Sequence, residues 1–230
     1  MTALDTAEGS AAPVEKSAPV PGPTPSGPSE QPAVPSEAAT PRRPLRADAQ
    51  RNRDKLIEVA TSAFVRDGSD IALEEIARRA DVGIGTLYRH FPTREALVVA
   101  VYRKQIDDLG QLAHDLPLTH GPADALRLWM QGFVEYGAVK RGLVGLLKSM
   151  METESDLFDQ ARATLRGSAG ALMKAAAEAG EIRPDFEPGD VIRALGGICM
   201  ATDRPDAGTS ALALVDLVFD GLRYGAPARS

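Results

Sequence analysis

Residues 73–97 read LEEIARRADVGIGTLYRHFPTREAL, and this stretch decides the fold class of the chain. Its apolar spacing predicts a short helix over residues 73–80 and a second over residues 84–90, separated by a turn at residues 81–83. A third helix is expected to follow, with Thr93 as its N-cap. A helix held across the end of another by a tight turn can enter the major groove of DNA. The stretch therefore predicts a helix-turn-helix.

The small and apolar side chains of this stretch are expected to hold its helices together. Ala77 and Ala80 let two crossing helices approach closely. Val82 and Leu87 fill the angle between the helices, and Phe91 anchors the far end of the second one. The remaining residues of the turn and the second helix are thus left for an exposed face.

That exposed face carries groups that suit DNA. Gly85 has no side chain and lets the backbone approach DNA, although glycine costs a helix roughly 1 kcal/mol relative to alanine. Thr86, Tyr88 and His90 can donate hydrogen bonds to phosphate oxygens, and Arg89 adds charge. Taken singly, Tyr88 is more often a packing residue and His90 a half-buried helix-end residue; their order and spacing favour DNA contact. The candidate DNA-binding residues of this face are Gly83, Ile84, Gly85, Thr86, Tyr88, Arg89 and His90.

Charge is divided unevenly along the chain. The whole chain has a net charge of -6, which is unusual for a DNA-binding protein. Residues 42–104 nevertheless contain 13 Lys and Arg against 9 Asp and Glu, a net of +4, whereas residues 1–41 and 105–230 are both acidic. A basic module between acidic flanks suits binding to a polyanion. Chance clustering of solvated charges is the alternative interpretation.

Residues 1–44 are predicted to be a disordered, proline-rich tail. They hold ten of the 17 prolines and show no apolar periodicity, so they cannot bury enough surface to offset their ordering entropy. The tail ends in PRRPLR, where Arg42, Arg43 and Arg46 precede the expected folded part. Two interpretations of these arginines stay open: a basic arm that reaches a phosphate backbone or a minor groove, and the end of a solvated linker.

The rest of the chain is also predicted to be helical, which makes the fold all-α. Apolar residues recur at helical spacing, and no alternating strand pattern of useful length is present. We expect a helix-turn-helix DNA-binding domain over residues 45–92 and a helical regulatory and dimerisation domain over residues 93–226. The expected helices of the second domain cover residues 93–116, 122–137, 143–151, 158–180, 189–200 and 210–224.

The last two of these helices are expected to join two copies of the chain. The final helix, ALALVDLVFDGLRY, is apolar on more than one face and needs cover on more than one side. A terminal helix is seldom the most enclosed part of a monomer, which favours a homodimer seam of four helices over central burial in one chain.

Large apolar side chains of the second domain are candidates for a small-molecule site. A pocket lined by some of them would be apolar and adaptable. The same residues are what a plain helical core contains, and that interpretation is preferred for most of them. The candidates are Trp129, Phe133, Met150, Phe158 and Met173.

The run GIGTLYRHFPTREAL, preceded by IARRADV and a helix ending in AFVRDG, closely resembles the tetracycline-repressor (TetR) family of bacterial transcriptional regulators. The resemblance is strong over residues 48–109, and residues 110–230 match in layout. It implies that Ile84, Gly85 and Thr86 lie nearest the bases. It also implies that Tyr88, His90 and Arg94 grip phosphates. Members of this family bind near-palindromic operators as dimers, and a small ligand in the C-terminal domain shifts the fourth helix and releases the DNA.

The chain departs from the family pattern at three positions. Asp81 stands where the family usually has glycine, and aspartate tolerates the left-handed backbone better than most residues. Ala72 and Gly83 replace a frequent threonine and serine, so two hydroxyls that cap helices and touch phosphate are missing. Ile84 offers only an apolar contact, for instance with a thymine methyl group. Fewer phosphate contacts are expected from these positions, which Arg42, Arg43 and Arg46 would offset.

Other classes of function receive little support from the sequence. The chain has three histidines, one cysteine (Cys199) on an apolar helix face, and no nucleophile elbow, phosphate loop or metal-ligand spacing. We therefore expect no enzymatic activity, no cofactor and no metal. A helical interaction module without specific DNA binding is the remaining alternative, and the near-complete motif argues against it. The single cysteine, the lack of a secretory signal and the lack of a long apolar run predict a cytoplasmic protein.

Overall fold

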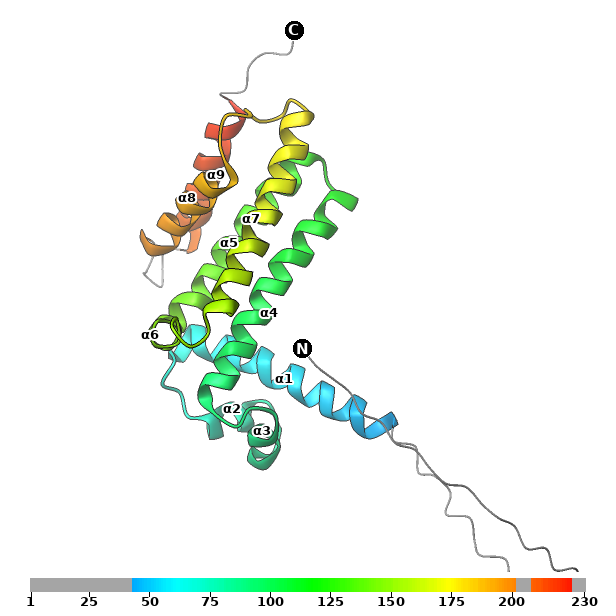
Figure 1. The fold of residues 1–230 in the computed structure, drawn as a ribbon, viewed down its shortest axis with the longest axis vertical. Coiled ribbons are helices and arrows are strands. Elements are labelled where there is room, and N and C mark those ends of the chain that lie inside the picture. Colours follow the sequence, from blue (N-terminus) through cyan, green and yellow to red (C-terminus); the bar gives the residue numbers. More distant parts are fainter. Residues whose placement is uncertain (1–42, 202–207, 225–230) are drawn as a thin grey trace, which may run out of the picture. The chain divides into compact units, whose positions relative to one another are not determined.

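The structure, a computed structural model, describes residues 43–201 and 208–224, with side chains from residue 47 onward in the first range and from residue 210 in the second. Every regular element in these ranges is a helix, as the sequence predicts (Figure 1). The elements are α1 (Arg43–Asp67), α2 (Leu73–Arg79), α3 (Ile84–His90), α4 (Arg94–Asp115), the 3-10 turn η1 (Leu116–Leu118), α5 (Pro122–Gly142), α6 (Val144–Ser149), α7 (Ser155–Glu178), α8 (Pro188–Ala201) and α9 (Gly208–Arg223).

The first three helices pack around a small apolar core. Leu56, Phe64 and Ile76 are fully buried, and Leu87 inserts from α3 with no exposed surface. α1 ends at Asp67 because Gly68 adopts a φ of +82°, which suits glycine and stops the helix. α1 begins at Arg43, within the last two residues of the predicted tail (residues 1–44) and before the expected domain start at residue 45.

α4, α5 and α7 form the body of the remaining part, where they run side by side (Figure 1). α5 is the central helix, since it contacts α1, α4, α7, α8 and α9. Its Leu126, Trp129 and Met130 are fully buried. The Trp129 indole Nε1 donates to the carbonyl oxygen of Leu109 at 3.0 Å, which satisfies the one polar group of that side chain.

α5 continues to Gly142 and does not stop near Gly137, where the sequence predicted its end. A Cβ atom on Gly137 would lie 2.2 Å from the Sγ atom of Cys199 on α8. The glycine is therefore required for close packing of two helices and does not mark a helix end. Periodicity within one helix gives no information about a neighbour 62 positions further along the chain, which explains the wrong boundary.

α8 and α9 pack together against α5. Ala211, Val215 and Phe219 form a buried stripe on α9. An ion pair fixes the rotation of this helix: Arg127 of α5 donates from Nε and Nη2 to the two carboxylate oxygens of Asp216, each at 2.9 Å. The opposite face of α9 is left exposed, with Leu217 66% exposed, and Met200 of α8 is 81% exposed.

Candidate functional site

The turn between α2 and α3 is built by the backbone around Asp81. Its φ is +52°, in the left-handed region that the sequence predicted for this position. The amide of Asp81 donates to Arg78 O at 3.1 Å, and the amide of Val82 donates to Ala77 O at 3.0 Å. This pair of bonds is the Schellman motif, which closes a helix and redirects the chain. It sets α3 across the end of α2.

α3 presents two kinds of side chain. Leu87 is fully buried, whereas Ile84 is 39% and Tyr88 43% exposed. Gly85 and Arg89 are also exposed, and a Cβ atom on Gly85 would meet nothing within 4 Å. Ile84 and Tyr88 are four residues apart, as are Gly85 and Arg89, so they form two adjacent rows on one face of α3. Thr86 and His90 are half-buried beside it.

Neither helix of this motif has a side-chain N-cap. The N-cap residues of α2 and α3 are Ala72 and Gly83, both extended, and neither makes a side-chain cap hydrogen bond. Both helices thus begin without the hydroxyl cap that a threonine or serine would supply at these two positions. α4 differs, because the Thr93 hydroxyl accepts from the amide of Ala96 at 3.2 Å and caps it as predicted.

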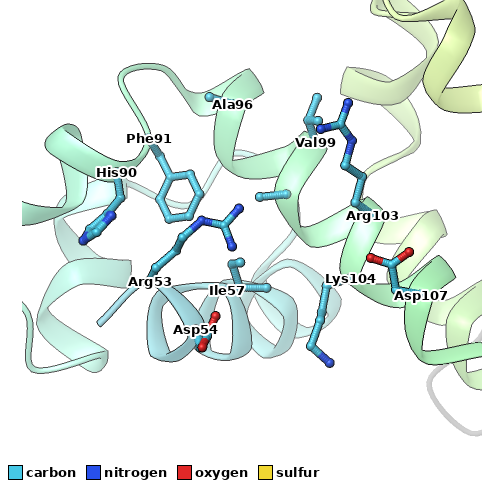
Figure 2. A pocket seen from close by; sticks show the side chains of 11 residues that line it. Arg53, Asp54, Ile57, His90, Phe91, Ala96, Val99, Arg103, Lys104 and Asp107 are labelled. Atoms are coloured by element: carbon cyan, nitrogen blue, oxygen red, sulfur yellow. The ribbon is translucent and has the colours of Figure 1, made fainter. Parts of the chain in front are cut away.

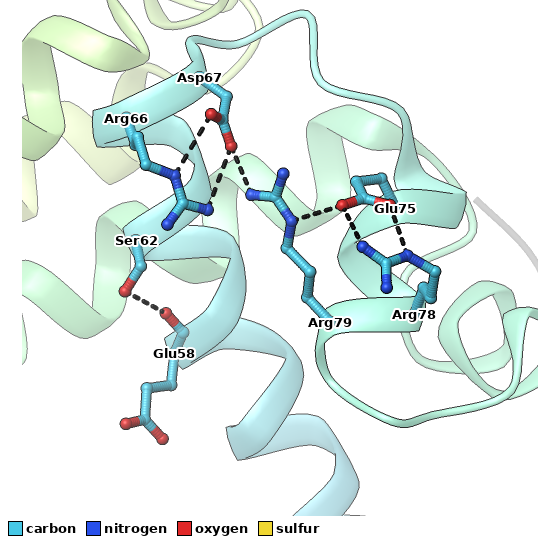
Figure 3. Close-up of polar contacts among 7 residues, drawn as sticks. All are labelled: Glu58, Ser62, Arg66, Asp67, Glu75, Arg78 and Arg79. Atoms are coloured by element: carbon cyan, nitrogen blue, oxygen red, sulfur yellow. Dashed lines mark hydrogen bonds and ion pairs between the residues drawn. The ribbon is translucent and has the colours of Figure 1, made fainter.

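A network of ion pairs attaches α2 to the end of α1 (Figure 3). Glu75 accepts from Arg78 Nε at 2.7 Å and from Arg79 Nε at 2.6 Å, and Arg79 also pairs with Asp67. Hydrogen bonds from Arg78 and then Arg79 lower the pKa of Glu75 to about 2. Asp67 also accepts from Arg66 at 3.3 Å. Arg78 and Arg79 are therefore engaged within the protein.

Arg94 has an intramolecular role that sequence reasoning missed. Its Nη1 donates to Ser69 O at 2.6 Å and to Ile71 O at 2.7 Å, and the side chain is half-buried. These bonds use the Nη1 group, which carries two of the five N–H donors of the guanidinium, so the expected phosphate contact of Arg94 stays a prediction. Arg94 thus ties the start of α4 to the loop that leads into α2.

A shallow cavity of about 290 Å³ lies where α1, α3 and α4 meet (Figure 2). The guanidinium of Arg53 rises from α1 and lies 5.5 Å from the centre of the Phe91 ring. Phe91 is only 2% exposed, so the predicted anchoring role is confirmed. His90 lines the same cavity, with its ring centre 6.2 Å from that of Phe91.

A larger cavity of about 510 Å³ opens on the body of the protein, between α4, α5, α6, α7 and α8. Its wall contains two hydroxyls that contact each other, since Tyr136 OH of α5 donates to Tyr102 OH of α4 at 3.3 Å. Burial raises the pKa of both tyrosines. The lining residues are Tyr102, Phe133, Tyr136, Lys140, Val144, Leu147, Lys148, Met151, Phe158, Arg162, Leu165, Ile192 and Gly196.

Two of the five predicted ligand residues line this cavity. Phe133 and Phe158 belong to its wall, whereas Trp129 and Met150 do not. Met173 lines a separate cavity of about 330 Å³ beside α7 and the segment before α8. Sequence reasoning missed the tyrosines and cations of the wall. Tyr136 and Lys140 are four residues apart with Phe133 on the same face of α5, a pattern that could have indicated them.

Comparisons with known proteins assign both parts of the chain. Residues 56–101 match the family described as "Bacterial regulatory proteins, tetR family", and residues 121–224 match "Transcriptional regulator SbtR-like, C-terminal domain". A crystal structure of a TetR transcriptional regulator from Streptomyces coelicolor is 43% identical, with a TM-score of 0.69, and the match covers 74% of this chain and 98% of that one. The chain belongs to the TetR family of transcriptional regulators.

Two further transcriptional regulators are also similar to this chain. A TetR regulatory protein from Mycobacterium vanbaalenii is 34% identical, with a TM-score of 0.64 and coverage of 78% of this chain and 99% of that one. An HTH-type transcriptional regulator of Staphylococcus aureus is 36% identical over 64 residues, 27% of this chain. That match spans only 35% of the Staphylococcus protein. The resemblance stated from the sequence is confirmed.

The TetR assignment gives the helix-turn-helix its role. α2 and α3 form the DNA-binding motif of a transcriptional regulator, and regulators of this family are generally not enzymes. Within the residues that the structure describes, no helix is long and apolar enough to cross a membrane.

The basic segment before the TetR domain is only partly described. Arg42 lies outside the described residues, as does the predicted tail up to that point. Arg43 and Arg46 belong to the first turn of α1, so their backbone is helical and does not form an extended arm. The side chains of both residues are outside the described part of the chain.

Proposed function

We propose that this regulator binds a near-palindromic operator as a homodimer, acts as a repressor, and is released from DNA by a small molecule. The observation that carries the proposal is the exposed face of α3. Gly85 and Arg89 lie beside Ile84 and Tyr88 on a helix that Leu87 holds in place from the buried side. A short helix with a glycine on its outer face suits close approach to a groove.

The contacts at this face divide into two classes. Ile84, Gly85 and Thr86 would lie nearest the bases, where an apolar side chain and bare backbone favour thymine methyl groups. Tyr88, Arg89 and His90 would contact phosphates. The Tyr88 hydroxyl lies 3.4 Å from Glu74 Oε1 and is free to turn toward a phosphate, since this contact is long. Arg94 would position the motif, because its Nη1 is bonded to the loop before α2.

Dimerisation would use the exposed faces of α8 and α9. Met200, Leu212 and Leu217 are large apolar side chains with 81%, 41% and 66% exposure. The ion pair between Arg127 and Asp216 keeps this side of α9 outward. Exposed apolar side chains gathered on two adjacent helices favour a contact with a second copy, which would set two α3 helices for two half-sites.

The response to a small molecule would run along α4. Arg94 at its start holds the loop before α2, and Tyr102 lines the 510 Å³ cavity. These residues are eight positions apart, about 12 Å along a helix. A ligand that displaces Tyr102 would therefore move the element that positions the DNA-binding motif. We expect the protein to act in the cytoplasm, where its operator would be.

Fluorescence anisotropy tests sequence-specific DNA binding, with a duplex taken from the DNA that flanks the gene of this protein. Specific binding over a scrambled duplex is expected, and Tyr88→Ala should weaken it by more than about 1 kcal/mol. Phe186→Ala is a matched control, since Phe186 is exposed to a similar extent (41% against 43%) in the segment between α7 and α8. Equal binding to both duplexes would favour an interaction module without specific DNA binding.

Light scattering tests the homodimer. Leu217→Glu should shift the mass from two chains toward one, because a buried carboxylate without a partner is costly. Leu118→Glu is the control, since Leu118 is 73% exposed in η1, away from α8 and α9. A mass unaffected by Leu217→Glu would contradict this interface.

A further inference from the structure

The cavity on the body has a one-sided distribution of charge. Its wall contains three cationic residues, Lys140, Lys148 and Arg162, and among the described residues that line it there is no carboxylate. Arg162 is already paired with Asp159 of the same helix. The ion pairs formed within the described residues include neither Lys140 nor Lys148. Two positive charges are thus left for a partner from outside.

Lys140 is held beside the tyrosine pair. Its Nζ lies 5.9 Å from the centre of the Tyr136 ring. Partial removal of this ammonium from water lowers its pKa, and the nearby charge of Arg162 acts in the same direction. A lysine in such a place gains from an anion, which supplies the negative charge that the described residues of the wall lack.

The hydroxyl pair also has a donor to offer. Tyr136 OH donates to Tyr102 OH at 3.3 Å, which leaves the proton of Tyr102 for another acceptor. A lysine ammonium carries three donors and no acceptor. The polar end of the cavity therefore presents donors, and a ligand head group must accept hydrogen bonds there.

The remaining wall is apolar. Phe133, Leu147, Phe158, Leu165 and Ile192 come from four different helices and enclose space for a hydrophobic body. A volume of about 510 Å³ lies within the range of sites that hold small molecules. Apolar walls and a cationic, donor-rich end favour a ligand with an apolar body and an anionic head group that accepts hydrogen bonds.

We propose that this cavity binds an apolar carboxylic acid, with the carboxylate at Lys140 and the Tyr102–Tyr136 hydroxyls and the hydrocarbon part against Phe133 and Phe158. The inference rests on the proposed response to a small molecule and names the chemical class of that molecule. The head group would accept the Tyr102 proton that the bond from Tyr136 leaves unused, so it would extend the hydrogen bond that joins α4 to α5.

Three probes of one chain length and different charge test the ligand class: decanoate, 1-decanol and decyltrimethylammonium. Binding to the full chain is followed by the fluorescence of Trp129, the one tryptophan of the protein, whose ring centre lies 5.9 Å from that of the cavity residue Phe133. Decanoate is expected to bind at least tenfold more tightly than either of the other probes. Equal binding of all three probes, preference for the cation, or binding of none would overturn the proposal.

Variants locate the head group. Lys140→Gln and Tyr102→Phe should each weaken decanoate binding by about tenfold and leave decanol binding unchanged, since they remove a charge or a hydroxyl and keep the wall. Lys174→Gln is the matched control, because Lys174 is a lysine of α7 outside this cavity. A decrease in decanoate affinity in Lys174→Gln equal to that in Lys140→Gln would mean that only overall charge matters, and would also overturn the site.

Operator binding separates this inference from the regulatory proposal. If decanoate binds through Lys140 and leaves operator affinity unchanged, the ligand class stands and the proposed release from DNA fails. If decanol or the cation releases the operator and decanoate does not, the response to a small molecule stands and the carboxylate site is wrong.

Discussion

Gly142 at the end of α5 lies directly against the backbone of Phe64 near the end of α1. A Cβ atom on Gly142 would be 2.3 Å from the carbonyl oxygen of Phe64, closer than any ordinary contact. That carbonyl accepts a hydrogen bond from the amide of Gly68 at 3.2 Å, at the point where α1 stops. At this point the backbone of α5 thus contacts the backbone of α1, the first helix of the DNA-binding domain, with no side chain between them.

Gly142→Ala should destabilise the protein by about 1–3 kcal/mol, the usual cost of overpacking. The obstacle is backbone, so no side-chain rotation relieves it. Gly145→Ala is the control, because a Cβ atom at Gly145 would meet nothing within 4 Å. Thermal or urea unfolding of both variants gives the answer; equal stability of the two would show that α1 and α5 separate easily.

Replacing Asp81 by glycine should stabilise the fold by about 1 kcal/mol, because aspartate is strained at a φ of +52°. Little is lost with the side chain, since the ion pair that it makes within the described part of the chain, with Lys55 at 4.0 Å, is solvent-exposed. Urea unfolding measures the difference in the free energy of unfolding. Asp81→Val is the opposite case, because a β-branched residue at this left-handed φ should destabilise the fold. An Asp81→Gly protein no more stable than the original would mean that the Schellman turn carries no strain.

The helix-turn-helix could be predicted from the sequence because its signals are local. The bounds of α3, the left-handed turn at Asp81 and the cap at Thr93 each depend on neighbours within a few residues. The burial of Leu87 follows from the same periodicity. Where a few adjacent residues determine a conformation, sequence reasoning is sufficient.

The roles of Arg94 and of the cavity residues depend on distant parts of the chain. Arg94 bonds carbonyls 23 and 25 positions earlier, and Tyr102 meets Tyr136 from another helix 34 positions away. Helix periodicity says which face of one helix is apolar, and it does not say which faces meet. The same reason leaves Trp129 among the pocket candidates beside the preferred interpretation of a plain core; in the structure it is a buried core residue whose Nε1–H donates to Leu109 O.

Acid should weaken the attachment of α2 to α1. The pKa of Glu75 falls from its ordinary value of 4.5 to about 2 in the folded protein, so its ion pairs stabilise the fold fully above about pH 4.5 and are lost as the pH falls toward 2. The melting temperature of the original protein should thus exceed that of Glu75→Gln near pH 6, with a gap that closes in acid. The network is solvent-exposed, so the gap is expected to be small. A gap that widened on acidification would contradict this sign.

Arg42, Arg43 and Arg46 should affect the salt dependence of operator binding. If Arg42, Arg43 and Arg46 bind phosphates, replacing all three with glutamine should reduce the slope of log K against log salt by roughly 0.9 for each phosphate that is no longer neutralised. Removal of residues 1–41, which carry one basic residue, is the control and should not reduce the slope. An identical slope in the triple variant would assign these arginines to a solvated linker end.

Gly85→Ala separates folding from DNA binding at the exposed face of α3. Alanine should stabilise this helix by about 1 kcal/mol relative to glycine, and its Cβ atom would meet nothing within 4 Å in the free protein. If DNA lies against the backbone here, the same methyl group should reduce operator affinity about tenfold or more, because it occupies the space of the groove. Unfolding and anisotropy measurements on one variant should therefore move in opposite directions. Gly145→Ala, which adds a methyl group on α6, should leave operator affinity unchanged. Unaltered operator affinity in Gly85→Ala would exclude a close approach of DNA at Gly85 and leave Tyr88 and Arg89 as the residues to examine.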